Sequence, residues 1–276
     1  STPTTPPDIM KLHLCLFSVA SAIVVKDHPV LKLRGGLAGV DTNTVATAAT
    51  CITGLNAVYC ALAPEPAAEA YGVKGASFNV VQMIKALGNT NLMVVVLAAC
   101  LLKGVDTNTA IAWSQLPWII GCLDAIFNGT GEKMGQPAFA QPLLLAISAA
   151  TMYCGFTGTN MPLAGQLNAG WGLLNGVGAA LVPDKLASAW GMSGDSAFNA
   201  MMKNFGFALC SASVLTYCVA SGQPFIQSLG YAWAVLLVGL VDQKFVSKTF
   251  DDIGGDDGPL YAWMAISAAV TAGLLA

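Results

Sequence analysis

The sequence contains very little charge. Only 10% of its 276 residues are Asp, Glu, Lys or Arg, whereas about 25% is usual in a soluble protein. Together with an apolar share of 55%, this shortage excludes an ordinary soluble surface. With a net charge of −3 and Arg34 as its one arginine, the chain also lacks the basic surface that binds nucleic acid. We therefore predict a polytopic all-α membrane protein with membrane lipids, and no nucleic acid, among its partners.

Histidine and catalytic motifs are similarly scarce. His13 and His28 both precede the long apolar runs, so no imidazole is expected inside the helix bundle to bind haem, copper, iron or zinc. The sequence has no Walker motif, nucleophile elbow or dinucleotide-binding glycine pattern. These absences predict no catalytic residue, no metal ligand and no cofactor, and they favour a non-enzymatic protein.

Eight cysteines are present, but none forms a CxxC pair. Seven of them lie in or beside apolar runs: Cys51, Cys60, Cys100, Cys122, Cys154, Cys210 and Cys218. We interpret them as small apolar residues that pack between helices. A redox pair or a metal site is the alternative.

An internal repeat organises the chain. Leu55–Val73, LNAVYCALAPEPAAEAYGV, recurs without a gap as Leu174–Met192, LNGVGAALVPDKLASAWGM. Three further anchors recur in the same order: Ile84–Gly88 with Met202–Gly206, Gly121–Phe127 with Gly239–Phe245, and Ala146–Ala150 with Ala265–Ala269. The spacing stays near about 119 residues, which indicates an internal duplication.

Apolar windows predict about eight transmembrane helices in two four-helix repeats. The expected spans are 45–63, 81–102, 109–127 and 139–157, then 166–182, 199–220, 225–243 and 259–276. The corresponding domains are a presequence and linker (1–44), a first repeat (45–158) and a second repeat (159–276). Because each repeat has an even number of crossings, both enter from the same side, which predicts parallel repeats related by an axis along the membrane normal.

The N-terminal segment has the features of a targeting sequence. Residues 10–25 contain basic Lys11, an apolar core and small residues, as in a secretory signal peptide; a retained extra helix is the alternative. The following Lys32–Gly36, KLRGG, resembles the presequences of some algae with secondary plastids. This resemblance implies a plastid thylakoid membrane, and a secretory-pathway membrane is the alternative location.

The motif GVDTNT occurs twice, at Gly39–Thr44 and at Gly104–Thr109, each time before an apolar run. Asp, Thr and Asn side chains accept hydrogen bonds from the free N–H groups at a helix start. We predict that Asp41 and Asp106 are N-caps. A paired ion or phosphate site is the alternative.

Asn56 and Asn175 occupy the same position of the two repeats, inside an apolar helix and two turns before a proline. A buried amide in hydrocarbon needs a partner, usually on a neighbouring helix. The simpler interpretation is a contact between helices. The alternative is that both amides line a ligand or pigment site across the pseudo-twofold axis.

Two pairs of charged residues also recur between the repeats. Asp124 and Asp242 lie in the last turn of the third and seventh predicted spans, where we expect them to pair with Lys133 and Lys244 or to reach the interface. Lys85 and Lys203 begin the second and sixth spans, and we expect them to reach lipid phosphate or a helix end. A proton relay and an anionic-ligand site are the respective alternatives.

Each half resembles the DoxX-like superfamily of small four-helix membrane proteins and related families of unknown function. The shared feature is an apolar helix that runs into a proline, then Ala-rich sequence and a glycine, as in Leu55–Val73. The resemblance implies a four-helix unit and transfers no catalytic residue. The chain does not resemble light-harvesting antennae, whose chlorophyll-binding Glu–Arg pairs are missing from its spans.

These features predict a non-enzymatic accessory or scaffolding subunit of an organellar membrane complex, photosynthetic or respiratory. Its expected partners are other membrane protein subunits, and pigments or another small apolar ligand. The alternative function is a small-solute transporter or channel with its site at the repeat interface.

The positive-inside rule places the side of the bundle that holds the two prolines in the cytosol, stroma or matrix. The loops and helix ends expected on that side carry seven lysines: Lys74, Lys85, Lys133, Lys185, Lys203, Lys244 and Lys248. Asn128-Gly129-Thr130 is the one N-x-S/T sequon and lies on that side. We expect Asn128 to remain unmodified when the chain is expressed with its insertion signal in a eukaryotic secretory host. A mass increase that glycosidase removes would reverse this topology.

Overall fold

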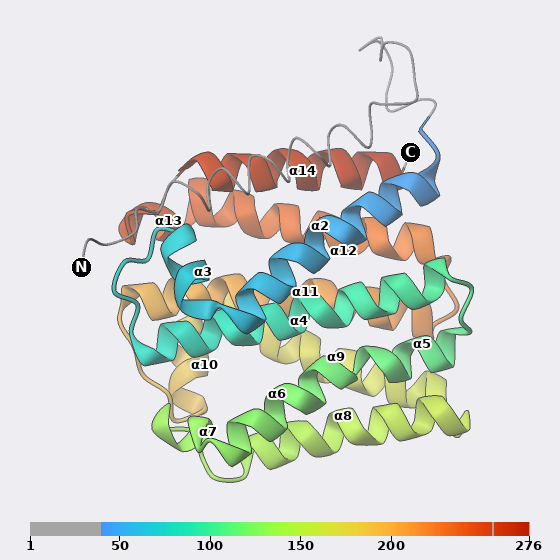
Figure 1. The fold of residues 1–276 in the computed structure, drawn as a ribbon, viewed down its shortest axis with the longest axis horizontal. Coiled ribbons are helices and arrows are strands. Elements are labelled where there is room, and N and C mark those ends of the chain that lie inside the picture. Colours follow the sequence, from blue (N-terminus) through green and yellow to red (C-terminus); the bar gives the residue numbers. More distant parts are fainter. Residues whose placement is uncertain (1–39, 256, 276) are drawn as a thin grey trace, which may run out of the picture.

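The computed structural model describes residues 40–255 and 257–275, and this part of the chain is all-helical, without strands (Figure 1). The helices are α2 (Thr42–Leu62), α3 (Pro64–Ala70), α4 (Phe78–Leu102), α5 (Thr107–Ser114), α6 (Leu116–Phe127), α7 (Thr130–Lys133), α8 (Ala140–Thr157), α9 (Met161–Leu181), α10 (Pro183–Ala189), α11 (Ser196–Ala220), α12 (Phe225–Val241), the π-helix η1 (Asp242–Val246), α13 (Thr249–Asp252) and α14 (Asp257–Leu275). The predicted signal at residues 10–25 lies outside the described residues.

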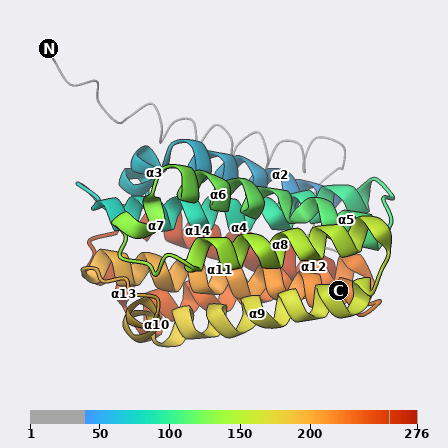
Figure 2. The same cartoon turned by 90° about the horizontal axis from the view of Figure 1, so that it is seen from below.

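The long helices run back and forth along one direction, and the four short helices α3, α7, α10 and α13 gather at one end of the bundle (Figures 1 and 2). We name this the short-helix end. Five helical segments in the described part are long and apolar enough to cross a membrane: Thr42–Leu62, Phe78–Leu102, Thr107–Phe127, Phe225–Val246 and Asp257–Leu275. This is consistent with an integral membrane protein. The windows predicted at 139–157, 166–182 and 199–220 form α8, α9 and α11, which do not belong to this set.

Aspartates begin three of the long helices. The carboxylate of Asp41 accepts a hydrogen bond from the Thr44 amide at 3.1 Å, and Asp106 accepts one from the Thr109 amide at 3.0 Å. These bonds satisfy amides that have no partner within the helix, and they confirm both predicted N-caps. Asp195 caps α11 in the same way.

Prolines determine where two long helices end. α2 stops at Leu62 and α9 stops at Leu181, and in each case a proline two residues later, Pro64 or Pro183, begins a short helix of seven residues. Proline has no N–H to continue a helix but fits its first position. The chain therefore turns at the same point after both helices.

Two glycines bring neighbouring helices into close backbone contact. A Cβ atom added to Gly88 of α4 would lie 2.6 Å from the backbone nitrogen of Ala61 on α2, and one added to Gly206 of α11 would lie 2.5 Å from that of Ala180 on α9. α4 and α11 also pack against each other in the centre, while α8 lies against α9 and α14 against α2. Small residues allow this approach where no hydrophobic force acts between helices.

The apolar core has two parts. Ile111, Met161, Leu215 and Leu229 are fully buried in the half of the bundle away from the short helices. At the short-helix end a second cluster surrounds Phe198. Large apolar side chains also remain on the outside, where they would face lipid: Leu62 and Phe127 are each 81% exposed.

The packing predicts a difference between two glycine substitutions. Gly206→Ala places a methyl group against α9 backbone, which no side-chain rotation relieves, and we expect it to destabilise the fold by about 1–3 kcal/mol. Gly170→Ala, on α9, has no atom within 4 Å of the new Cβ and should be neutral or slightly stabilising, since alanine favours helix. Thermal unfolding in detergent measures both, and equal stability of the two variants would contradict this packing.

Candidate functional site

A cavity of about 180 Å³ lies among α4, α6, α8, α9 and α11, between the first and second halves of the chain. Its surface is mostly apolar, and uncharged polar side chains are distributed among the lining residues: Gln82, Asn89, Gln115, Gln136, Gln141 and Asn168. Three indoles, Trp118, Trp171 and Trp190, supply most of its aromatic surface. Polar residues of α8, α9 and α11 also face this cavity. They make these three helices less apolar than the five segments that could cross a membrane.

The cavity borders an interrupted helix. α5 ends at Ser114 and α6 begins at Leu116, so Gln115 stands near the middle of the apolar stretch Thr107–Phe127. Pro117 cannot donate the backbone hydrogen bond that an unbroken helix needs. Gln115 keeps right-handed helical dihedrals (φ −75°, ψ −19°), so the interruption is a proline kink, which surrounding protein tolerates within a membrane.

An amide pair joins this interruption to α9. The Nδ2 of Asn168 donates a hydrogen bond to Oε1 of Gln115 at 2.7 Å, and Nε2 of Gln115 donates to the Ser114 hydroxyl at 3.2 Å. Gln115 is fully buried. Because amides in a membrane bundle need such partners, the pair fixes the polar groups that line the middle of the cavity.

An ion pair borders the cavity toward the short-helix end. Nζ of Lys85 on α4 lies 2.6 Å from the Asp124 carboxylate on α6, and both side chains are about one-third exposed (31% and 37%). Asp124 also accepts a hydrogen bond from Asn128 at 2.9 Å. The predicted pairing of Asp124 with Lys133 is wrong, because Lys133 donates to the Asn128 carbonyl. Loop proximity suggested Lys133, whereas the packing of α4 on α6 brings Lys85 closer.

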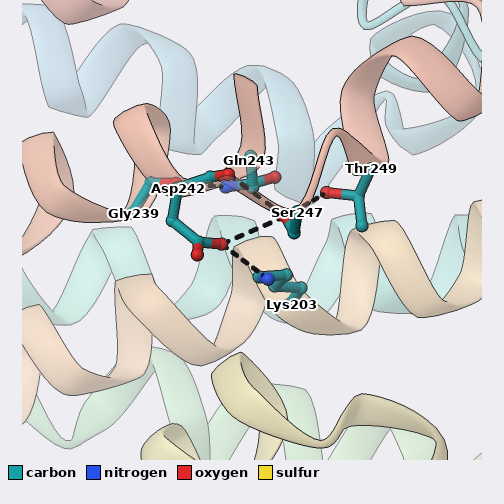
Figure 3. Close-up of polar contacts among 6 residues, drawn as sticks. All are labelled: Lys203, Gly239, Asp242, Gln243, Ser247 and Thr249. Carbon is teal, nitrogen blue, oxygen red and sulfur yellow. Dashed lines mark hydrogen bonds and ion pairs between the residues drawn. The ribbon is translucent and has the colours of Figure 1, made fainter. Parts of the chain in front are cut away.

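The equivalent ion pair of the second half is more enclosed. Nζ of Lys203 lies 2.5 Å from Asp242, and the side chains are 9% and 23% exposed. Asp242 begins η1 and also accepts a hydrogen bond from Ser247, whose hydroxyl lies 3.3 Å from that of Thr249 (Figure 3). Neither member of this pair lines the cavity.

The predicted partner of Asp242 is also wrong. Lys244 contacts Asp251 and Asp257, at 2.5 and 2.7 Å, instead of Asp242. Its side chain thereby connects η1 with α13 and with the start of α14. Lys85 and Lys203 each bond a carboxylate of a neighbouring long helix, so their charge is neutralised within the protein.

The two asparagines each bond an aromatic residue of their own half. The Tyr71 hydroxyl donates to Oδ1 of Asn56 at 3.1 Å, and Nε1 of Trp190 donates to Oδ1 of Asn175 at 3.2 Å. Burial raises the pKa of Tyr71 well above its ordinary value, so its hydroxyl stays protonated and can donate. Both contacts attach a long helix to the segment after the proline. Asn175 lines the cavity, and Asn56 does not.

The two halves differ at the cavity. Alignment of the repeat anchors matches Gln115 with Trp233 and Asn89 with Phe207. Trp233 is buried (2% exposed) within the apolar core, and a Cβ on Gly239 would lie 2.4 Å from the Phe207 ring. The second half therefore holds bulky aromatic side chains at the two positions where the first half has amides beside a cavity.

The sequence interpretation did not identify Gln115, Asn168 or Asn89. Each is a single amide in an apolar run, a pattern that also occurs in structural contacts. The detectable signals were the proline within a span, at Pro117, and the differences between aligned repeat positions. Within the described residues no three His, Cys, Asp or Glu side chains form a group able to hold a metal, and the seven cysteines there are unpaired thiols.

No known protein-family description, curated protein or solved structure matches this chain.

The two ion pairs predict different losses of stability when the lysine of each pair is replaced by methionine. Lys203→Met leaves Asp242 largely enclosed without its cation, and loss of one member of a buried pair costs about 3–5 kcal/mol. Lys85→Met affects a pair that is one-third exposed, and we expect a cost of about 1 kcal/mol or less. Thermal unfolding of both variants in the same detergent compares them. If Lys85→Met loses as much stability as Lys203→Met, the result would contradict the conclusion that the Lys203–Asp242 pair is the more enclosed one.

Proposed function

We propose that the chain is an integral membrane protein of two parallel four-helix repeats, whose interface binds a small molecule through an uncharged polar group. The protein would act as a carrier or transporter for that molecule. The cavity, which occupies one side of the interface between the halves, carries this proposal.

Several paired features support the repeat arrangement. α2 and α9 each have 21 residues, and α4 and α11 each have 25. A Lys–Asp pair and an Asn–aromatic hydrogen bond occur once in each half. The contact of α8 with α9 has its counterpart in that of α14 with α2. These correspondences are expected if a twofold axis along the membrane normal relates the halves.

The difference between the halves supports a ligand site. At the aligned positions of the second half, the bulky side chains of Trp233 and Phe207 stand in place of Gln115 and Asn89. Gln115 and Asn89 instead border a cavity with several amides in its lining, next to a proline-kinked helix. A cavity with converging polar groups is the usual form of a small-molecule site.

The lining limits the chemistry of the bound group. Amides both donate and accept hydrogen bonds, and hydroxyl or amide groups of a ligand would satisfy them. Lys85 and Asp124 already neutralise each other, so the cavity offers no unpaired charge. A cavity of about 150 Å³ can hold benzene, so a volume of about 180 Å³ suits a group of similar size.

The accessory-subunit role predicted from the sequence, with a plastid thylakoid location, is the competing proposal. In that case the chain would purify in a complex with other membrane subunits, and the cavity would have no ligand that depends on its amides. Purification from native membranes in mild detergent separates the two proposals. Small molecules extracted from the purified chain are identified by mass spectrometry.

A double substitution tests the carrier proposal. Asn89→Phe with Gln115→Trp introduces the residues of the second half into the cavity, and we expect at least a tenfold loss of the co-purifying molecule with the fold retained. Asn56→Leu is the matched control, because it removes an amide outside the cavity and should change stability by only about 0.6 kcal/mol. If the folded double variant keeps as much of the molecule as the wild type, the cavity is not the binding site.

A further inference from the structure

An apolar groove lies on the outside of the first half, beside the cavity. Side chains of α2, α4 and α5–α6 form it, including Leu62, Leu92, Val96, Trp113 and Ile120. Leu62 is 81% exposed and Ile120 is 57% exposed. All of these residues belong to segments apolar enough to cross a membrane, so in a bilayer the groove opens toward the hydrocarbon chains of the lipids.

The groove and the cavity share one wall. Four residues line both of them: Lys85, Asn89, Gly121 and Asp124. Gly121 contributes no side chain, and a Cβ there would lie 2.4 Å from Nδ2 of Asn89. The Asn89 amide thus occupies the space that Gly121 leaves free, directly between the two hollows.

No hydrogen bond of the described residues holds the Asn89 side chain, although amides within membrane bundles normally have a partner. A rotation of this side chain would therefore break no existing hydrogen bond. In the second half a Phe207 ring occupies the equivalent place against Gly239. That ring has no polar group to offer a ligand.

We propose that Asn89 forms a lateral portal and that the ligand is an uncharged, single-chain amphiphile. Its polar head occupies the cavity and hydrogen-bonds to the amides, while its hydrocarbon chain passes Asn89 and lies in the groove. A charged head is disfavoured because it would have to separate Lys85 from Asp124, which already neutralise each other. This inference rests on the proposed function, and it adds the ligand class and the route of access.

Binding of three probes to the purified full chain tests the ligand class. 1-Monooleoylglycerol has an uncharged head and one chain, glycerol has the head alone, and oleate has the chain with a charged head. Native mass spectrometry in detergent counts bound molecules over a concentration series. We expect one saturable monooleoylglycerol site, with glycerol and oleate binding at least tenfold more weakly. Equal binding of glycerol would show that the groove takes no part, and equal binding of oleate would overturn the preference for an uncharged head.

Variants of the wall and groove test the portal. Asn89→Phe should lower monooleoylglycerol affinity at least tenfold, whereas Phe207→Leu, at the equivalent position of the second half, should change it less than twofold. Ile120→Asn alters an exposed groove residue, which the fold tolerates, and should lower affinity about three- to tenfold. Unchanged affinity in both Asn89→Phe and Ile120→Asn would overturn the portal.

Gln115→Trp distinguishes failure of the portal from failure of the proposed function. If it removes the co-purifying molecule while Asn89→Phe and Ile120→Asn do not, the cavity still binds a ligand but the portal is wrong. If none of the three variants changes ligand content, both the portal and the cavity site are wrong.

Discussion

The contact of backbone with backbone at Gly88 and Gly206 sets the positions of the other elements. At these glycines α2 lies on α4 and α9 lies on α11, at distances that leave no room for a Cβ atom. α4 and α11 in turn pack against each other. Because Lys85 and Asn89 lie within one turn of Gly88, this contact also fixes where the ion pair and the cavity wall stand relative to α6.

The two halves differ in the side chains at aligned positions. Trp233 and Phe207 provide apolar, bulky side chains in the second half, and their aligned counterparts Gln115 and Asn89 border the cavity between the halves. The Lys–Asp pair and the Asn–aromatic hydrogen bond occur in both halves. The difference between the halves therefore lies in the size and polarity of side chains at a few positions.

Features that depend on residues close together in the chain could be predicted from the sequence. The N-caps at Asp41 and Asp106 were predictable because a cap bonds an amide three residues away. The ends of α2 and α9 followed from the prolines after them. An all-helical, membrane-like chain followed from composition.

Features that depend on packing between distant segments were missed or assigned incorrectly. Asp124 pairs with a lysine on another helix, 39 residues away in the chain, so the nearby Lys133 was a misleading choice. Gln115 and Asn168 are single amides in separate apolar runs, and nothing local shows that they bond to each other. The difference between Asn89 and Phe207 becomes apparent only when the aligned positions of the two halves are compared in the structure.

The central claim is that the cavity between α6, α8 and α9 is a ligand site and that the region around Trp233 is not. An experimental density map of the protein purified from native membranes tests it most directly. The account predicts non-protein density bounded by Trp118, Trp171 and the Gln115–Asn168 pair, with none beside Trp233. A cavity closed by its own side chains, or equal lipid density at both interfaces, would contradict it.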